Sequence, residues 1–168
     1  MKLFLYCAIV LAWALIASPC GAKNLPEMTT LDAYIEFVQR TAGEARDATE
    51  ESGYFKSTIA DIASIRFFEG INDDRDIDEI VELLLKSVTR SCDAFRLVAV
   101  GREKLDGMTL VRGAVRCVVM GVELHGEELI IADATRFHNY SIGGPMANRD
   151  KISAIAARMF DALVAAYR

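Results

Sequence analysis

The chain has 168 residues, and its 19 Lys and Arg residues against 24 Asp and Glu residues give a formal net charge of −5. This acidic balance argues against a nucleic-acid-binding protein, which needs a positive surface to contact phosphates. The length is sufficient to bury one hydrophobic core, and the 52% apolar composition disfavours disorder and a collagen-like chain.

The first 22 residues have the pattern of a secretory signal peptide. Met1-Lys2 is a short positive start, Leu3–Ala17 is an apolar run of 15 residues, and the helix-breaking Pro19 precedes small residues. The run is shorter than the roughly 20 residues that span a bilayer, so we expect cleavage after Ala22 rather than a retained membrane anchor. Lipid modification of Cys20 is an alternative, although Pro19 fits that processing poorly.

Residues 23–168 are then expected to form a single periplasmic or extracellular domain without stable membrane insertion. This part of the chain keeps two cysteines, Cys92 and Cys117. In an oxidising compartment they are expected to form one disulfide, whose loop of about 26 residues corresponds to roughly 3–4 kcal/mol of stabilisation by chain entropy. The alternative is two separate buried thiols.

Apolar residues at helical spacing predict three helices in the N-terminal half. Residues 29–32 resemble a capping box, and the first helix is expected from Leu31 to about Ala48. After the polar break at Ser52-Gly53, the apolar residues of segment 59–68 favour a second helix. A third helix with a wide apolar face is expected from Ile77 to near Ser91.

β-Branched residues then predict three strands, at Phe95–Lys104, Met108–Leu124 and Glu127–His138. Asp106-Gly107 separates the first two and is a strong hairpin signal, because both central positions of a type I′ turn need positive φ. His125-Gly126 separates the last two and is a weaker signal of the same kind. We therefore expect a three-stranded antiparallel meander.

The C-terminal segment is expected to contain a loop and a helix. Residues 139–146 are predicted to form a surface loop, which includes the formal N-glycosylation acceptor Asn139-Tyr140-Ser141. Asn148 can cap a final helix. The order of three helices, three strands and one helix predicts an α+β fold whose C-terminal helix packs on the sheet.

The turns also predict which side chains share a face of the sheet. If Leu105 pairs with Met108 and Leu124 with Glu127, both faces collect apolar residues. A sheet open to water on one side should alternate between apolar and polar residues. The pattern therefore implies helices on both faces, strong curling of the sheet, or a partner that covers one face.

The first hairpin register also places Cys117 and Gly113. Cys117 lies opposite Arg96, so a disulfide with Cys92 requires the chain before the first strand to fold back over the sheet. Gly113 lies within a long strand and is a candidate β-bulge, which would shift the pairing by one residue.

A candidate anion site lies at one end of this predicted sheet. In the expected register His138 faces Gly113 and shares a face with Arg102 and Arg136. The missing side chain of Gly113 would leave a hollow, and two guanidinium groups with an imidazole would suit a carboxylate or phosphate group. The alternative is that these are solvated strand ends whose long side chains cover apolar neighbours.

Metal and catalytic signatures are weak. Segment 72–78 begins like an EF-hand calcium loop, but Ile77 replaces the required glycine and Leu83 the required bidentate glutamate, so an acidic first helical turn is the simpler interpretation. His125 is expected in a solvated turn. The chain has no nucleophile elbow, phosphate-binding glycine loop or Cys-x-x-Cys pair, and we expect neither a metal nor a cofactor.

Two functional hypotheses follow. The first is a small exported, non-catalytic protein-binding module, such as an adaptor, inhibitor or immunity-type protein, acting through a protein partner or as a homo-oligomer. The second is a small hydrolase or anionic-ligand-binding protein that uses Arg102, Gly113, Arg136 and His138. Neither hypothesis identifies a substrate or a partner.

Overall fold

The computed structural model describes residue 28 and residues 30–51, 54–72, 75–105 and 107–167. The expected signal peptide, its cleavage site and Cys20 lie outside the described residues. Within the described ranges, no helix is both long enough and apolar enough to cross a membrane.

The described residues build one antiparallel sheet of seven strands in the order β1-β2-β3-β7-β6-β5-β4. The strands are β1 Arg46–Glu51, β2 Tyr54–Ile59, β3 Ala63–Ile71, β4 Ala94–Leu105, β5 Met108–Val119, β6 Val122–Ala132 and β7 Arg136–Pro145. The helices are α2 Leu31–Thr41, α3 Ile77–Thr89 and α4 Arg149–Tyr167, with a short 3₁₀ turn η1 at Met146–Asn148.

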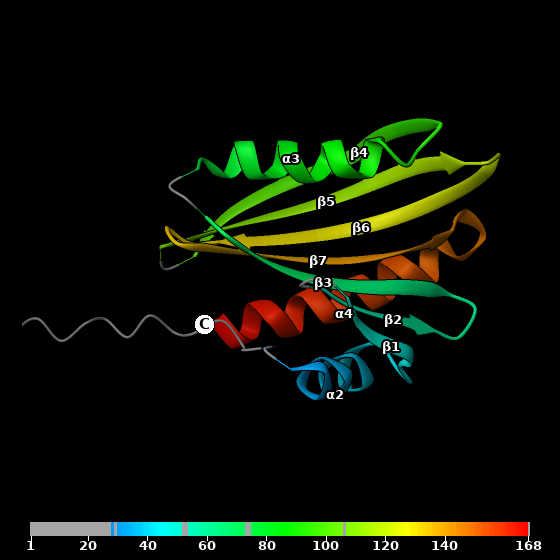
Figure 1. The fold of residues 1–168 in the computed structure, drawn as a ribbon, viewed down its shortest axis with the longest axis horizontal. Helices are drawn as coiled ribbons and strands as arrows, with labels where there is room; N and C mark the ends of the chain where they lie inside the picture. The colour runs from blue at the N-terminus through cyan, green and yellow to red at the C-terminus, as the bar shows by residue number, and fades with distance from the viewer. Residues whose placement is uncertain (1–27, 29, 52–53, 73–74, 106, 168) are drawn as a thin grey trace, which may run out of the picture.

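Helices cover both faces of this sheet (Figure 1). α3 lies on one face, over the half formed by β4, β5 and β6, while α2 and α4 lie on the other face. Because every neighbouring pair is antiparallel, β3 and β4 run in the same direction although three strands separate them. Strands that run in the same direction need a crossover connection, and α3 supplies it.

The main hydrophobic core lies between the sheet and the pair α2 and α4. Its fully buried members include Tyr34, Leu129, Ile131, Tyr140 and Ile152. A much smaller cluster lies under α3, where Ile80 packs against Val111, Ile130 and Ala132. Two layers of unequal packing therefore flank the sheet.

The expectation of three N-terminal helices and a three-stranded meander is wrong. Only α2 precedes the first strand, and it ends at Thr41 instead of continuing to Ala48, so that β1 begins at Arg46. The helix expected over 59–68 is instead a β-hairpin. Its side chains Ala63, Ile65 and Phe67 are buried at alternate positions, which is the period of a strand and not of a helix.

The start of α2 does follow its capping signal. The Thr30 side chain accepts a hydrogen bond from the Ala33 backbone N–H over 3.2 Å, which satisfies one of the free donors of the first turn. The helix buries Tyr34, Phe37 and Val38 against the sheet. At its end, the Ala42 N–H donates to the Val38 carbonyl.

The second hairpin turn is not at His125-Gly126. It lies at Met120-Gly121, where both residues have positive φ, +50° and +79°, as a type I′ turn requires. His125 and Gly126 lie inside β6. Gly126 serves close packing instead, because a Cβ there would lie 3.0 Å from Cγ2 of Val115.

The loop expected over 139–146 is also wrong, because this segment forms most of β7. β7 is inserted beside β3 in the middle of the sheet. Asn139 is accordingly buried in a strand, and not on a surface loop as the glycosylation motif suggested. Asn148 donates instead to the carbonyl oxygens of Asp61 and Ile62.

The registers explain why the apolar faces were nevertheless assigned correctly. Leu105 pairs with Met108, and the one-residue shift falls between Leu97 and Ala99, not at Gly113. The second turn lies five residues earlier than expected, so the pairing slips by ten residues. An even slip leaves every side chain on the same face.

Candidate functional site

The incompletely packed side of α3 encloses a cavity of about 430 Å³ between this helix and the sheet. α3 contributes Val81, Leu84 and Leu85 to its wall. The sheet contributes a largely apolar floor, which comprises Phe68, Leu97, Val100, Val111, Val115 and Ile130. Its volume falls within the range of about 300–1,000 Å³ that is usual for small-molecule sites.

A row of polar positions crosses the floor of this cavity. Arg66 on β3 pairs with Ser141 on β7, which pairs with Glu128 on β6, which in turn pairs with Gly113 on β5. Directly paired residues of antiparallel strands project from the same face of a sheet. Arg66, Ser141, Glu128 and Gly113 therefore line the cavity together.

Glu128 is the titratable group on the cavity floor. Its side chain is half-buried and makes a hydrogen bond with Asn139, which lies diagonally across on β7. Burial raises the pKa of Glu128 to about 7, because it disfavours the charged form, while the Asn139 hydrogen bond and the charge of Arg66 act in the opposite direction. This carboxyl group therefore changes its charge near neutral pH.

Arg66 and Tyr54 lie at the β2–β3 end of the cavity. Arg66 is exposed and makes no hydrogen bond or ion pair with any of the described residues. The Tyr54 hydroxyl donates a hydrogen bond of 2.5 Å to Glu51, and this bond raises the pKa of the Tyr54 phenol. The guanidinium group of Arg66 is thus available at the rim.

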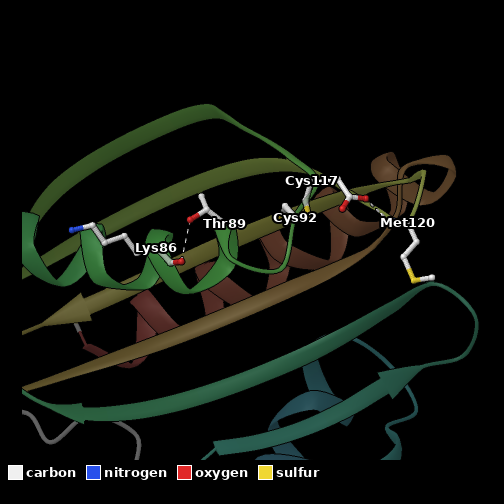
Figure 2. Close-up of a disulfide and its surroundings, with 6 residues drawn as sticks. Lys86, Thr89, Cys92, Cys117 and Met120 are labelled. Carbon is white, nitrogen blue, oxygen red and sulfur yellow. Dashed lines mark hydrogen bonds between the residues drawn. A yellow bond between two sulfur atoms is a disulfide. The ribbon is translucent and has the colours of Figure 1, made fainter.

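The C-terminal end of α3 is fastened to β5 (Figure 2). The disulfide joins Cys92 to Cys117, with a Cα–Cα distance of 5.5 Å, as the sequence predicts. The Asp93 N–H donates to the Val118 carbonyl over 2.7 Å, and the Met120 N–H donates to the Asp93 carboxylate over 2.6 Å. The chain after α3 therefore turns back onto the sheet, as the disulfide requires.

The N-terminal end of α3 is attached separately. The Asn72 side chain donates to the Asp133 carbonyl over 2.6 Å and accepts from the Arg75 N–H over 3.0 Å. On α3 itself, the Asp78 carboxylate accepts an ion-paired hydrogen bond from Arg102 on β4. The helix is thus held at both ends, and the cavity extends beneath Val81, Leu84 and Leu85.

The structure brings only one of the four predicted anion-site residues to this cavity. Gly113 lines it, but Gly113 pairs with Glu128 and not with His138, so the expected pairing is wrong. Arg102 lies on the same face, where it pairs with Asp78. Arg136 lies 3.4 Å from Glu69 at the opposite end of β7 from the turn into α4.

His138 projects from the other face of the sheet, into the core under α2 and α4. It is 3% exposed and packs edge-on against Phe67, with ring centroids 5.4 Å apart. Its Nε2 atom lies 3.7 Å from a carboxylate oxygen of Glu69, and burial lowers the pKa of the imidazole. This geometry is that of a packed core histidine.

The other histidine is part of a polar network on the α4 side. His125 Nε2 lies 2.9 Å from Glu127 and 3.3 Å from the Ser153 hydroxyl, which itself lies 2.6 Å from the same Glu127 oxygen. A Ser-His-acid triad needs the acid on one ring nitrogen and the serine on the other. Here both partners share Nε2, so the arrangement links β6 to α4 and does not activate Ser153.

The sequence analysis missed Glu128, Arg66 and Asn139. A signal for Glu128 was present, because in the predicted strand it shares the face of Ile130 and Ala132, where an acidic residue interrupts an apolar stripe. No comparable signal existed for Arg66, which lay in a predicted helix. Among the described residues, no group of three or more His, Cys, Asp or Glu side chains could hold a metal ion.

The fold and the site together define a class of architecture: one antiparallel sheet between helices, with an apolar cavity under the crossover helix. No family model and no curated protein matches the sequence. Two solved structures are similar in fold. PA94 of Pseudomonas aeruginosa, a protein of unknown function, has a TM-score of 0.50 and 14% identity, over 68% of this chain and 83% of its own.

The second is the cyanobacterial PsbP protein (CyanoP) of Synechocystis sp. PCC 6803. Its TM-score is 0.51 and its identity 11%, over 73% of this chain and 78% of its own. Likenesses at this identity show a shared fold and do not transfer an activity.

Proposed function

We propose that this chain is an exported binding protein whose cavity under α3 takes a small, mainly apolar ligand with one polar group. The observation that carries the proposal is the cavity itself, which combines an apolar lining with a few convergent polar side chains. Val81 and Leu85 would cover the apolar part of the ligand, and Glu128 would contact its polar group.

The exported location is supported by the disulfide between Cys92 and Cys117, because such bonds persist in oxidising compartments. Cleavage after Ala22 is part of the same proposal. Intact-mass analysis of the native product would test it, since a retained leader would contradict it. Thiol labelling of the unreduced protein should find no free sulfur in residues 23–168.

The binding proposal is tested with a neutral apolar fluorophore, N-phenyl-1-naphthylamine. Two substitutions fill the cavity from different strands: Gly113→Leu on β5 and Val100→Trp on β4. Val100 is half exposed, so its replacement is compatible with folding. Both variants are expected to weaken binding of the fluorophore by at least about tenfold, because the added side chains occupy the space that the ligand needs.

Gly101→Leu is the matched control. It adds the same side chain as Gly113→Leu, but Gly101 pairs with Arg112 and has open space around it. The control should bind the fluorophore like the wild type. Equal binding by all four proteins would show that the fluorophore does not enter the cavity and would overturn the proposal.

A homo-oligomer is the second candidate, and the edge strand β4 favours it. Among the described residues β4 pairs only with β5, and Leu97, Val98 and Val100 on it are each at least 40% exposed. An exposed apolar edge can pair with the same strand of a second copy through a two-fold axis. Sedimentation analysis of wild type and Val98→Lys should then show a dimer only for wild type, whereas a wild-type monomer contradicts this candidate.

A further inference from the structure

We propose that the ligand of the cavity under α3 is an apolar carboxylic acid, whose carboxylate lies between Arg66 and Glu128 above Ser141. This inference rests on the proposed binding function and specifies its ligand class. The acid would place its hydrocarbon part against α3 and its head group on the polar row of the floor.

The spacing of the polar row provides the place for the head group. Arg66 on β3 and Glu128 on β6 are separated by β7, which at about 4.8 Å per strand sets their backbones roughly 10 Å apart. Between them lies Ser141, whose side chain is short. Arg66 and Glu128 make no direct ion pair, so a group between them can accept hydrogen bonds from both.

The sign of the ligand's charge follows from which charge of the site can be removed. The guanidinium group of Arg66 keeps its positive charge at all physiological pH values. The carboxyl of Glu128 loses its charge on protonation, and burial already raises its pKa to about 7. The permanent charge of the cavity is therefore positive, which favours an anion over an amine.

Protonated Glu128 would then act as a hydrogen-bond donor. Arg66 would donate to one oxygen of the bound carboxylate, while the Glu128 O–H donates to the other, as expected for charge-assisted hydrogen bonds. Binding would be accompanied by uptake of a proton on Glu128 wherever this residue is ionised in the free protein. The bound state would thus contain one cation, one anion and one neutral acid.

The surroundings of Glu128 contain few other ionisable groups. The charged or titratable side chains that line the cavity are Tyr54 on β2, Arg66 on β3 and Glu128 on β6. The described lining residues from α3, β4 and β5 are apolar or glycine. The pH dependence of binding near neutrality should therefore report on Glu128.

The experiment compares decanoate, decanol and decylamine by titration calorimetry with the full chain at pH 6.5. These compounds have the same hydrocarbon length and differ in the head group. Decanoate is expected to bind about ten- to a hundredfold more tightly than decanol, which is the range for a hydrogen bond to a charged group. Decylamine is expected to bind more weakly than decanol.

Arg66→Met should remove the preference for decanoate while leaving the affinity for decanol unchanged. Arg40→Met is the matched control, because Arg40 is an exposed residue of α2 on the opposite face of the sheet. It should retain the preference. Retention of the preference in Arg66→Met would overturn the assignment of the head-group position.

The pH dependence gives an independent test. Above pH 7 the wild-type affinity for decanoate should fall by roughly tenfold per pH unit, because one proton is taken up on binding. Glu128→Gln has a neutral donor at the same position and should bind decanoate with little change between pH 6 and pH 9. A wild-type affinity that does not change over this range would overturn the role of Glu128.

The outcomes separate this inference from the proposed function. If decanol or decylamine binds as tightly as decanoate, the carboxylic-acid class is overturned, while the binding function stands. If none of the three compounds binds and N-phenyl-1-naphthylamine does not bind either, the proposed function itself is overturned.

Discussion

Replacing Glu128 by Gln should make the protein more stable at alkaline pH and leave its stability unchanged at acidic pH. Gln has nearly the same shape, and its side chain can still bond to Asn139, but it carries no charge. In the folded protein the pKa of Glu128 is about 7, whereas its ordinary value is 4.5. The folded state therefore holds this proton more tightly than the unfolded state does.

The sign and the pH window follow from this difference. Below pH 4.5 the glutamate is protonated in both states, and its favourable contribution is fully present. As the pH rises from 4.5 through 7, the unfolded state loses the proton first, so the free energy of unfolding falls. Above pH 7 the folded state contains an ionised carboxylate in an apolar surrounding, and the contribution has been lost.

The magnitude is obtained from the same values. The difference of 2.5 between a pKa of about 7 and 4.5 corresponds to about 3 kcal/mol. Because the carboxyl is half-buried and water reaches it through the cavity, we expect solvent screening to reduce this to on the order of 1–2 kcal/mol. Glu128→Gln should gain that amount over wild type at pH 8.5.

Urea unfolding followed by circular dichroism, at pH 4.5, 6, 7 and 8.5, measures this dependence. Glu123→Gln on the same strand is the control, because Glu123 is exposed, and its curve should follow that of the wild type. Equal stability of Glu128→Gln and wild type at pH 8.5 would refute the reasoning, since the ionised carboxylate would then carry no cost.

Further changes test other parts of the structure by urea unfolding. Replacing both Cys92 and Cys117 by Ser should cost roughly 3–4 kcal/mol, the chain-entropy value for a sequence separation of 25, and no loss would show that the bond does not form. Gly144→Ala should cost on the order of 1–3 kcal/mol, because its Cβ would lie 2.3 Å from a backbone carbonyl oxygen, while Gly101→Ala should change little in its open surroundings. Ser153→Ala should cost about 1 kcal/mol by removing a hydrogen bond that links α4 to β6, and an unchanged midpoint would contradict that link.

How much of the fold the sequence predicts depends on the range of the interactions involved. The cap at Thr30 and the Asp106-Gly107 turn are local signals, and the structure has a helix start and a hairpin there. The strands β2 and β3 were missed because Ile59 and Ile62 lie three residues apart, which imitates a helix. That spacing arises from the turn between the two strands, where Ala60 has a φ of +43°.

The arrangement of the sheet could not be predicted in this way. β7 pairs with β3, which precedes it by 65 residues or more, and no local pattern encodes that pairing. The candidate site depends on it, because Arg66 reaches the cavity only through this contact. Gly113 was singled out for a hollow that does exist, but its polar neighbour is Glu128 and not His138, since the turn signal at Met120-Gly121 was weak.

The attachment of α3 has a consequence for how such a domain can be modified. The distance between the C-terminal half of the helix and the floor depends on the short segment that leads to Cys92, and the strand sequences do not set it. Adding or deleting a residue in this segment should alter the height of the chamber while leaving the hydrogen-bond ladder of the strands intact. One scaffold can thereby be adapted to guests of different thickness by a change in linker length alone.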